Sequence, residues 1–195
     1  IIAGETAPAS GSLTSHAKLG FLHQNTNEAH ETIADLFGVT ALLTALARIL
    51  AGEGSDDDLA DADWTLESRI EDALSQMGLP ELHPQTQLGS LSGGQKTRAA
   101  LAALIFHEPD LILLDEPTNN LDMQGREAVL HLLRNWRGGA LVVSHDRTLL
   151  REMNRIIELT PIGVSSYSGN WDFYETRKAE ELAAARHDLA VAETA

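Results

Sequence analysis

Cysteine is absent from this 195-residue chain, which excludes disulfide bonds and thiolate metal sites and fits a cytoplasmic protein. Long apolar runs are absent as well. The longest candidate, Gly38–Leu50, is interrupted by threonines and an arginine, and a membrane crossing needs about 20 predominantly apolar residues. We therefore expect no membrane-spanning segment.

Basic residues are scarce. The chain has 14 lysines and arginines against 29 aspartates and glutamates, which gives a formal net charge of −15. Proteins that bind nucleic acids by charge usually present a basic face. The arginines between Arg147 and Arg155 are better explained as a solvated helix face. Direct, charge-driven binding of DNA or RNA by this chain is not expected.

The second half of the chain alternates between strand and helix patterns. A helix is predicted over about 93–106, and another from apolar residues spaced as Val129, Leu132, Leu133 and Trp136. Continuous apolar runs predict buried strands at 111–114 and 140–143, and shorter strands are expected at 155–159 and 163–167. Such alternation indicates an α/β fold with a parallel sheet covered by helices.

The first half is mostly helical. A short strand is predicted at 18–22, ending at His23 and Gln24, and a helical pattern follows from 28 to 77. The acidic stretch 52–58 interrupts that pattern and is predicted to be a solvated loop, because an EF-hand's glycine and terminal glutamate are not at the required spacing. After Trp171 the chain is rich in Ala, Glu and Arg, without Pro or Gly, which favours one long helix.

Polar residues follow both buried strands. Asp115-Glu116 comes after the first, and Ser144-His145-Asp146 after the second. In an open parallel sheet, ligands bind beyond the carboxyl ends of the strands. Adjacent residues on an extended chain point in different directions, so Asp115 can hold Mg²⁺ while Glu116 faces a water molecule. On its own, the acidic pair would equally fit two solvated turn residues.

A third string opens the predicted helix at 93, and it reads Leu91-Ser92-Gly93-Gly94-Gln95. Two glycines let a ligand approach the backbone closely, and a helix N-terminus offers free N–H groups at the positive end of its dipole. Ser92 can add a hydroxyl or cap the helix. This pattern suits a terminal phosphate, although an ordinary serine cap would have the same residues.

The order of these strings, rather than any one of them, resembles the ABC ATPase family. There, Leu91–Gln95 is similar to the signature motif, Leu111–Thr118 to the Walker B segment, Leu121-Asp122 to the D-loop, His145 to the switch histidine and Gln24 to the Q-loop. The resemblance implies a partial P-loop NTPase domain. Its segments would be a remnant of the ATP-binding core (1–24), an α-helical subdomain (25–90), the signature helix and Walker B core (91–168), and the start of a helical linker (169–195).

The resemblance also implies roles at an ATP and Mg²⁺ site. Asp115 and Gln24 would hold Mg²⁺, Glu116 would be the general base, and His145 would contact the γ-phosphate. The signature residues would bind the γ-phosphate of ATP held by a second, facing ABC domain, and Asp122 would couple the two sites. That signature set is Ser92, Gly93, Gly94 and Gln95.

One departure from the family is large, because no Gly-x-x-x-x-Gly-Lys-[Ser/Thr] string occurs anywhere in the sequence. In the family this P-loop precedes the helix whose end Ile1–Gly4 resembles. The simplest interpretation is a chain that starts just after the P-loop helix. We therefore expect no ATP hydrolysis by this chain alone, together with exposed apolar sheet edges and self-association or poor stability.

Two features resemble the ABC-F branch, in which two ATPase domains share one polypeptide without a membrane part. They are Asn119-Asn120 and the segment Tyr167–Tyr174 followed by a charged helix, which resembles the linker after the first domain. This implies an ATP-driven conformational switch, with the ribosome as the implied partner in translation. Two alternatives stay open: the ATP-binding subunit of an ABC transporter, and a non-catalytic regulatory domain.

Overall fold

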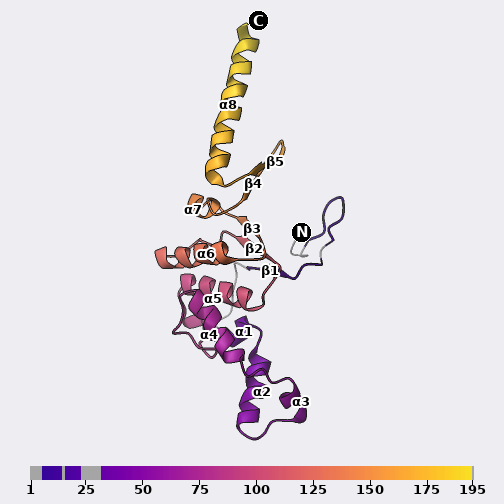
Figure 1. The fold of residues 1–195 in the computed structure, drawn as a ribbon, viewed down its shortest axis with the longest axis vertical. Coiled ribbons are helices and arrows are strands. Elements are labelled where there is room, and N and C mark those ends of the chain that lie inside the picture. The colour runs from indigo at the N-terminus through magenta and orange to yellow at the C-terminus, as the bar shows by residue number, and fades with distance from the viewer. Residues whose placement is uncertain (1–5, 15, 23–31, 195) are drawn as a thin grey trace. The chain divides into compact units, whose positions relative to one another are not determined.

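A computed structural model describes residues 6–14, 16–22 and 32–194 (Figure 1). The chain divides into two units, the first ending at Val143 and the second beginning at Ser144. Each has a sheet of its own, with three strands in the first unit and two in the second. None of the helices in the described ranges combines the length and apolar character that a bilayer crossing needs.

The sheet of the first unit is parallel and has the order β1-β2-β3. Its central strand, β2 (Leu111–Asp115), pairs with β1 (Leu19–Phe21) on one side and β3 (Gly139–Val143) on the other. Ile112 and Leu114 of β2 are almost fully buried. This is the expected result for a continuous apolar strand in the middle of a parallel sheet. The predicted α/β fold and the buried strand at 111–114 are confirmed.

Three helices pack together beside this sheet. α5 (Gly93–Phe106) contacts β1 and α6 (Met123–Asn135), and α4 (Leu66–Gln76) packs on α5. Because α6 connects β2 to β3, it returns the chain to the edge where the strands begin. The buried apolar side chains of these helices include Ile70, Leu74, Ala99, Leu101, Ala102, Val129 and Leu132.

The end of α4 is fixed to α5 by a buried arginine. Gly78 adopts a left-handed backbone (φ 68°), and its N–H donates to Ser75 O at 2.9 Å, which closes the helix. The Arg98 guanidinium, 7% exposed, donates to the carbonyls of Met77 (3.3 Å) and Gly78 (3.1 Å). Arg98 therefore satisfies carbonyls that the helix end leaves over, and it ties α4 to the helix that begins at Gly93.

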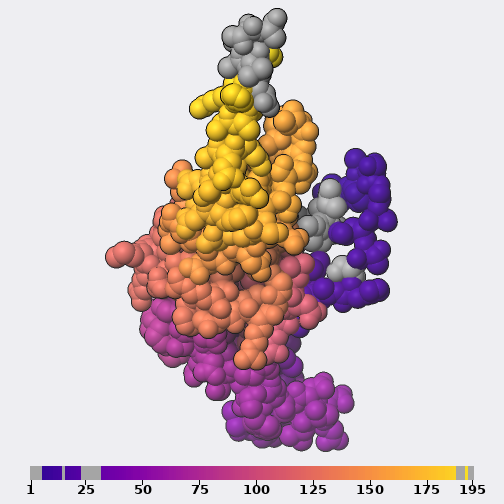
Figure 2. Space-filling view, turned by 45° about the horizontal axis from the view of Figure 1, so that its top comes forward, coloured from indigo at the N-terminus to yellow at the C-terminus, as the bar shows by residue number. Residues whose placement is uncertain are grey.

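A helical insertion precedes α4. It contains α1 (Ile33–Leu36), α2 (Thr40–Leu50) and α3 (Asp56–Ala60), and the 3₁₀ turn η1 (Leu88–Ser90) leads from α4 into α5. In the space-filling view, α2 and α3 project from the rest of the first unit (Figure 2).

The prediction of a loop over 52–58 was wrong in part, because Asp56–Asp58 form the first turn of α3. Ser55 and Asp58 cap that turn reciprocally, and Arg48 of α2 pairs with the Asp58 carboxylate. These contacts hold the pKa of Asp58 well below its usual range. The acidic residues lie at the positive end of the helix, where they are stabilising, and the Ser-x-x-Asp spacing was the signal for this cap.

The prediction that 140–143 is a buried strand was also wrong in part. The strand forms, but Leu141 is 38% exposed and Val143 is 58% exposed. Within the described residues β3 pairs only with β2, so its other edge lies open. An apolar run such as this one is suited to a strand with a neighbour on each side.

The second unit consists of α7 (Arg147–Leu150), the antiparallel hairpin β4 (Arg155–Thr160) and β5 (Gly163–Ser168), and the long helix α8 (Trp171–Thr194). The predicted strands and the final helix are confirmed. One face of the hairpin is apolar and exposed: Ile157 (51%), Leu159 (77%) and Val164 (69%), with Ile162 (99%) in the turn.

The other face of the hairpin holds α8 through a polar network. The Glu158 carboxylate accepts hydrogen bonds from Lys178 Nζ (2.7 Å) and Tyr174 Oη (3.0 Å), while Tyr167 Oη donates to Glu181 Oε2 (3.0 Å). The rings of Tyr167 and Tyr174 meet edge to face, with centroids 5.0 Å apart. The hydrogen bond from Lys178 keeps the pKa of Glu158 below its usual value, and burial raises the pKa of Tyr174.

We expect Lys178→Met to make the second unit more sensitive to acid. The lowered pKa of Glu158 contributes stability above the ordinary glutamate pKa of about 4.3, and this contribution is lost as the pH falls through the lower folded value. Without Lys178 the near-ultraviolet circular dichroism of the tyrosines should collapse at a higher pH. Arg177→Met, which removes an exposed pair with Glu180, is the matched control. Equal acid midpoints for the wild type and Lys178→Met would contradict this role.

Candidate nucleotide site

The candidate acidic pair lies where β2 ends. Asp115 is the last residue of the strand and is exposed, whereas Glu116 is half-buried and its Oε1 atom is buried. The Glu116 N–H donates to Val143 O at 2.8 Å, so the turn is anchored to the end of β3. The two carboxylates therefore lie in different environments, one exposed and one half-buried.

Glu116 has a left-handed backbone conformation, with φ of 46°. This conformation costs a non-glycine residue roughly 1 kcal/mol or more. Hydrogen bonds on both sides hold it, from Glu116 N to Val143 O and from Asn119 N to Glu116 O (3.0 Å). The turn thus fixes the direction of the glutamate at the edge of the sheet. No feature of the sequence pattern predicted this strain.

The signature string forms the start of α5. Ser92 is the N-cap: its Oγ accepts from Gln95 N (3.3 Å), and Gln95 Oε1 accepts from Ser92 N (2.9 Å). This capping box leaves the Ser92 hydroxyl proton and the Gln95 amide group as donors. A structural cap and a phosphate contact are therefore compatible at the same residues.

The two glycines of the string have different surroundings. A Cβ placed on Gly93 would meet nothing within 4 Å, so this position is open space. A Cβ on Gly94 would lie 3.3 Å from Asn120 O and 3.7 Å from Leu121 Cδ2. Gly94 thus permits the start of α5 to approach the loop after Glu116. Sequence reasoning had singled out Asn120 only for the family branch, and its φ of 61° suits the tolerance of asparagine for this conformation.

Asp122 is the N-cap of α6. Its Oδ1 accepts from Gly125 N at 2.8 Å, and a Cβ on Gly125 would lie 3.1 Å from that oxygen. Leu121 beside it is buried. The carboxylate of Asp122 therefore caps the start of α6. Asp122 follows Leu121, whose side chain lies close to Gly94.

The first unit holds seven candidates in two neighbouring segments, namely the start of α5 and the loop that joins β2 to α6. Ser92, Gly93, Gly94 and Gln95 come from the helix, and Asp122 from the loop that Gly94 touches; Asp115 and Glu116 open the same loop. Leu22 N donates to Leu113 O at 3.1 Å, so β1 ends beside β2. Gln24 follows β1 but lies outside the described residues.

His145 belongs to the second unit, where it is exposed between β3 and α7. Its neighbour Asp146 caps α7 by accepting from Thr148 N at 2.9 Å, and Asp146 N donates to Ser144 Oγ at 3.0 Å. The turn that carries His145 is thus held by hydrogen bonds between side chains and backbone within the second unit.

The residues at the end of β2 suit a magnesium ion held jointly with phosphate oxygens. Mg²⁺ usually keeps several waters and binds one or two carboxylates together with substrate phosphates. Asp115 offers one exposed carboxylate at the strand end. In the described part of the chain no group of three or more His, Cys, Asp or Glu side chains is arranged to hold a metal by itself.

Comparison with known proteins identifies the family to which this domain belongs. The sequence pattern of the family described as ABC transporter matches residues 1–119. The chain belongs to this family and carries an ABC-type ATPase domain. Among solved structures, the archaeal ribosome recycling factor aABCE1 in complex with the ribosomal stalk protein aP1 is similar in fold. It has a TM-score of 0.62 and 22% identity over 92% of this chain and 33% of that one.

A second solved structure is the ATP-binding cassette MJ0796 in a dimeric, post-hydrolysis state with ADP and phosphate. Its TM-score is 0.59, with 25% identity over 77% of this chain and 62% of that one. The parallel sheet with its packed helices is therefore the fold of ABC ATPase domains.

The similarity falls on the ABC-F branch of the family. The ATP-binding protein Uup of Haemophilus influenzae is 42% identical over 120 residues, 61% of this chain and 18% of its own length. The energy-dependent translational throttle protein EttA of Mycobacterium tuberculosis is 40% identical over 128 residues, 65% of this chain and 22% of its own. This chain thus spans about one fifth of the length of these relatives.

Proposed function

We propose that this chain is part of an ABC-F-like ATPase in which two ABC domains face each other head to tail. The observation that supports the proposal is the close approach of Gly94 to the loop at Asn120, because the start of α5 then lies beside the loop that leads from Glu116 to Asp122. A γ-phosphate of ATP held by the facing domain would accept hydrogen bonds at this helix start. The donors are the Ser92 hydroxyl, the Gln95 amide and the N–H groups of the first turn.

Asp115 and Gln24 would hold Mg²⁺, and the ion would supply charge neutralisation at the phosphates of ATP. Glu116 accepts the proton of the attacking water, and backbone hydrogen bonds to Val143 O and from Asn119 N hold its turn. For His145, which belongs to the second unit, the resemblance to the family supports a hydrogen bond to the transferred phosphate. Asp122 couples the two sites across the domain pair. ATP hydrolysis then drives a conformational switch.

The switch acts on the ribosome during translation, in the cytoplasm. The name of the relative EttA, a translational throttle protein, supports this target, as do Asn119-Asn120 and the α8 helix that follows the β4–β5 hairpin. The transporter alternative draws support from the family description and from a metal-chelate type ABC transporter of similar fold. Co-sedimentation with ribosomes, in the presence and absence of ATP, separates these two readings.

Gly93→Ala tests the phosphate contact without harming the fold. The added methyl group meets nothing within 4 Å, and alanine is favoured over glycine in a helix by up to about 1 kcal/mol, so the chain should be as stable as the wild type or more so. The methyl group would nevertheless occupy the space where a phosphate approaches. The assay adds this chain to a separate ABC domain that has a P-loop and measures the ATP turnover of that domain. We expect the wild-type chain to stimulate this turnover, and Gly93→Ala to lower the stimulation about tenfold or more.

Ser90→Ala, two residues before the N-cap, is the control and should stimulate like the wild type. If Gly93→Ala stimulated turnover as strongly as the wild type, the start of α5 would not contact the phosphate. Failure of the wild-type chain to stimulate its partner at all would favour the non-catalytic regulatory reading.

A further inference from the structure

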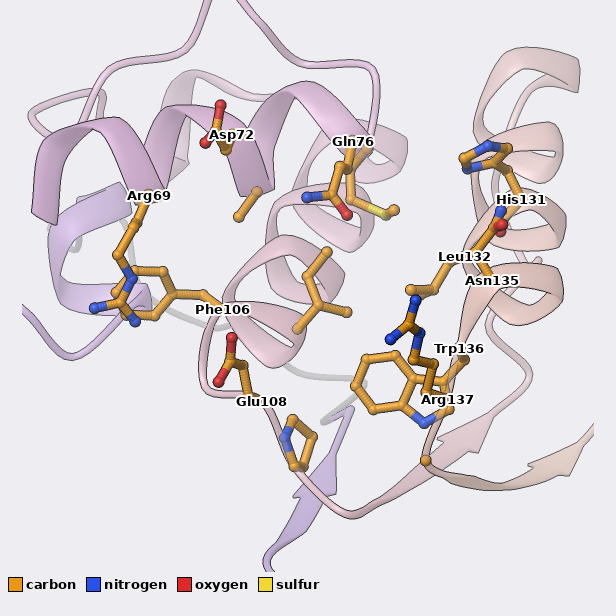
Figure 3. A pocket seen from close by; sticks show the side chains of 15 residues that line it. Arg69, Asp72, Gln76, Phe106, Glu108, His131, Leu132, Asn135, Trp136 and Arg137 are labelled. Atoms are coloured by element: carbon orange, nitrogen blue, oxygen red, sulfur yellow. The ribbon is translucent and has the colours of Figure 1, made fainter. Parts of the chain in front are cut away.

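A cavity lies near the end of the parallel sheet where β2 and β3 begin, whereas the candidate nucleotide site lies where β2 ends. The cavity has a volume of about 540 Å³ and lies between α4, α5 and α6 (Figure 3). It reaches Pro109, just before β2, and Gly138, just before β3. Ser92 and Asp122 lie at the other ends of α5 and α6. The cavity is therefore separate from the candidate ATP site, and its size falls within the range of about 300–1,000 Å³ typical of ligand sites.

The bottom of the cavity is apolar and its aromatic walls are held in place. Four buried side chains form the floor: Ala73, Met77, Ile105 and Leu132. The Trp136 indole N–H donates to Gly139 O at 3.1 Å. Phe106 meets Phe37 edge to face at 5.3 Å and lies 4.7 Å below the Arg69 guanidinium. This surface fits an aliphatic or aromatic group.

Four charged side chains line the same hollow, Arg69, Asp72, Glu108 and Arg137 (Figure 3). Arg69 is paired with Asp63 at 3.0 Å, whereas Glu108 and Arg137, which have opposite charges, form no ion pair with any residue in the described part of the chain. Glu108 holds its place at the end of α5 with a left-handed backbone (φ 47°), where glycine or asparagine is usual. The backbone N–H of Glu108 donates to Ile105 O at 3.0 Å, which keeps the residue against the cavity.

The pair of charges selects the ligand. An anion would lie against the Glu108 carboxylate, a cation against the Arg137 guanidinium, and a neutral apolar molecule would desolvate both without a partner. A zwitterion satisfies both, because its ammonium group can bind the carboxylate and its own carboxylate can bind the guanidinium with two parallel hydrogen bonds. The Gln76 side chain, at the same rim, adds an amide that can donate or accept.

We propose that this cavity binds a small zwitterion with an apolar side group, of the hydrophobic α-amino acid class. The side group lies on the floor between Phe106 and Trp136, the ammonium group lies at Glu108, and the carboxylate lies at Arg137. The proposal does not depend on ATP hydrolysis, since the site shares no residue with the candidate nucleotide site.

Isothermal titration calorimetry of the 195-residue chain tests the proposal with three probes. L-phenylalanine carries both charges, N-acetyl-L-phenylalanine lacks the ammonium group, and L-phenylalaninamide lacks the carboxylate. We expect saturable binding of L-phenylalanine and about tenfold weaker binding of each derivative, which is the effect of one lost charge-assisted hydrogen bond.

Two variants assign the charges, and both positions are exposed, so the fold should survive. R137Q should lower the affinity for L-phenylalanine about tenfold, and this variant should bind L-phenylalanine and L-phenylalaninamide equally well. E108Q should also lower the affinity for L-phenylalanine about tenfold, and it should bind L-phenylalanine and N-acetyl-L-phenylalanine equally well. The pair Glu127 and Arg134, which lies outside the cavity, supplies the controls E127Q and R134Q. No saturable binding of L-phenylalanine up to about 10 mM would overturn the proposal. So would binding that neither variant changes, and so would equal affinity for all three probes.

Discussion

ATP turnover should fall about 10²- to 10⁴-fold when Glu116 is replaced by glutamine in a form of the protein supplied with a P-loop segment. Glutamine keeps the size of the side chain and the turn held by Val143 O and Asn119 N, but it cannot accept the proton of the attacking water. The affinity for Mg-ATP should change by no more than about threefold, because an interaction made mainly in the transition state is the one removed.

Steady-state phosphate release and nucleotide titration, measured on the same preparation, separate these two effects. Glu127→Gln on α6 is the control, since that glutamate is exposed and forms only a surface pair with Arg134. If Glu116→Gln kept turnover within about threefold of the wild type, Glu116 would not be the base. The site would then need another proton acceptor, and a regulatory role would gain support.

The isolated chain should self-associate through the open edge of its parallel sheet. β3 exposes Leu141 (38%) and Val143 (58%) on a strand that pairs only with β2 in the described residues. An unpaired apolar edge is a template for another strand. Light scattering after size exclusion should therefore show a mass above 21.1 kDa that rises with concentration.

Leu141→Lys should raise the concentration needed for association about tenfold, because an edge charge opposes strand pairing. Leu42→Lys is the matched control: Leu42 is 40% exposed, close to the value for Leu141, but it lies on α2 rather than on a strand edge. A monodisperse monomer of 21.1 kDa with a high melting temperature would contradict the expectation of an open, adhesive edge.

The contrast between β2 and β3 shows what a sequence pattern predicts and what it leaves out. Both strands are apolar runs of nearly the same length, and both form. Only β2 is buried, because burial requires neighbours on both edges and faces, and these come from outside the strand. The pattern reports the environment to which a strand is suited, whereas the structure reports the environment that the chain provides.

The candidate site divides in a similar way. Local patterns placed Ser92 at the start of a helix and Asp115 at the end of a strand, and the structure has them there, whereas the role of Asp122 as the N-cap of α6 was not predicted. The left-handed turn at Glu116 and the approach of Gly94 to Asn120 were beyond the sequence, since each depends on residues brought together by the sheet. The short helix at Asp56–Asp58 was a missed signal, because a serine three residues before an aspartate is a cap that can be recognised.

Titration of Mg-ATP into the purified chain, followed by calorimetry, tests whether the chain can hold a nucleotide of its own. Its sequence has the residues proposed for catalysis and for contact with a facing domain, but no Gly-x-x-x-x-Gly-Lys-[Ser/Thr] loop. The account predicts no detectable heat of binding. Clear, saturable binding by the chain would contradict it, and the nucleotide would have to be held in another way.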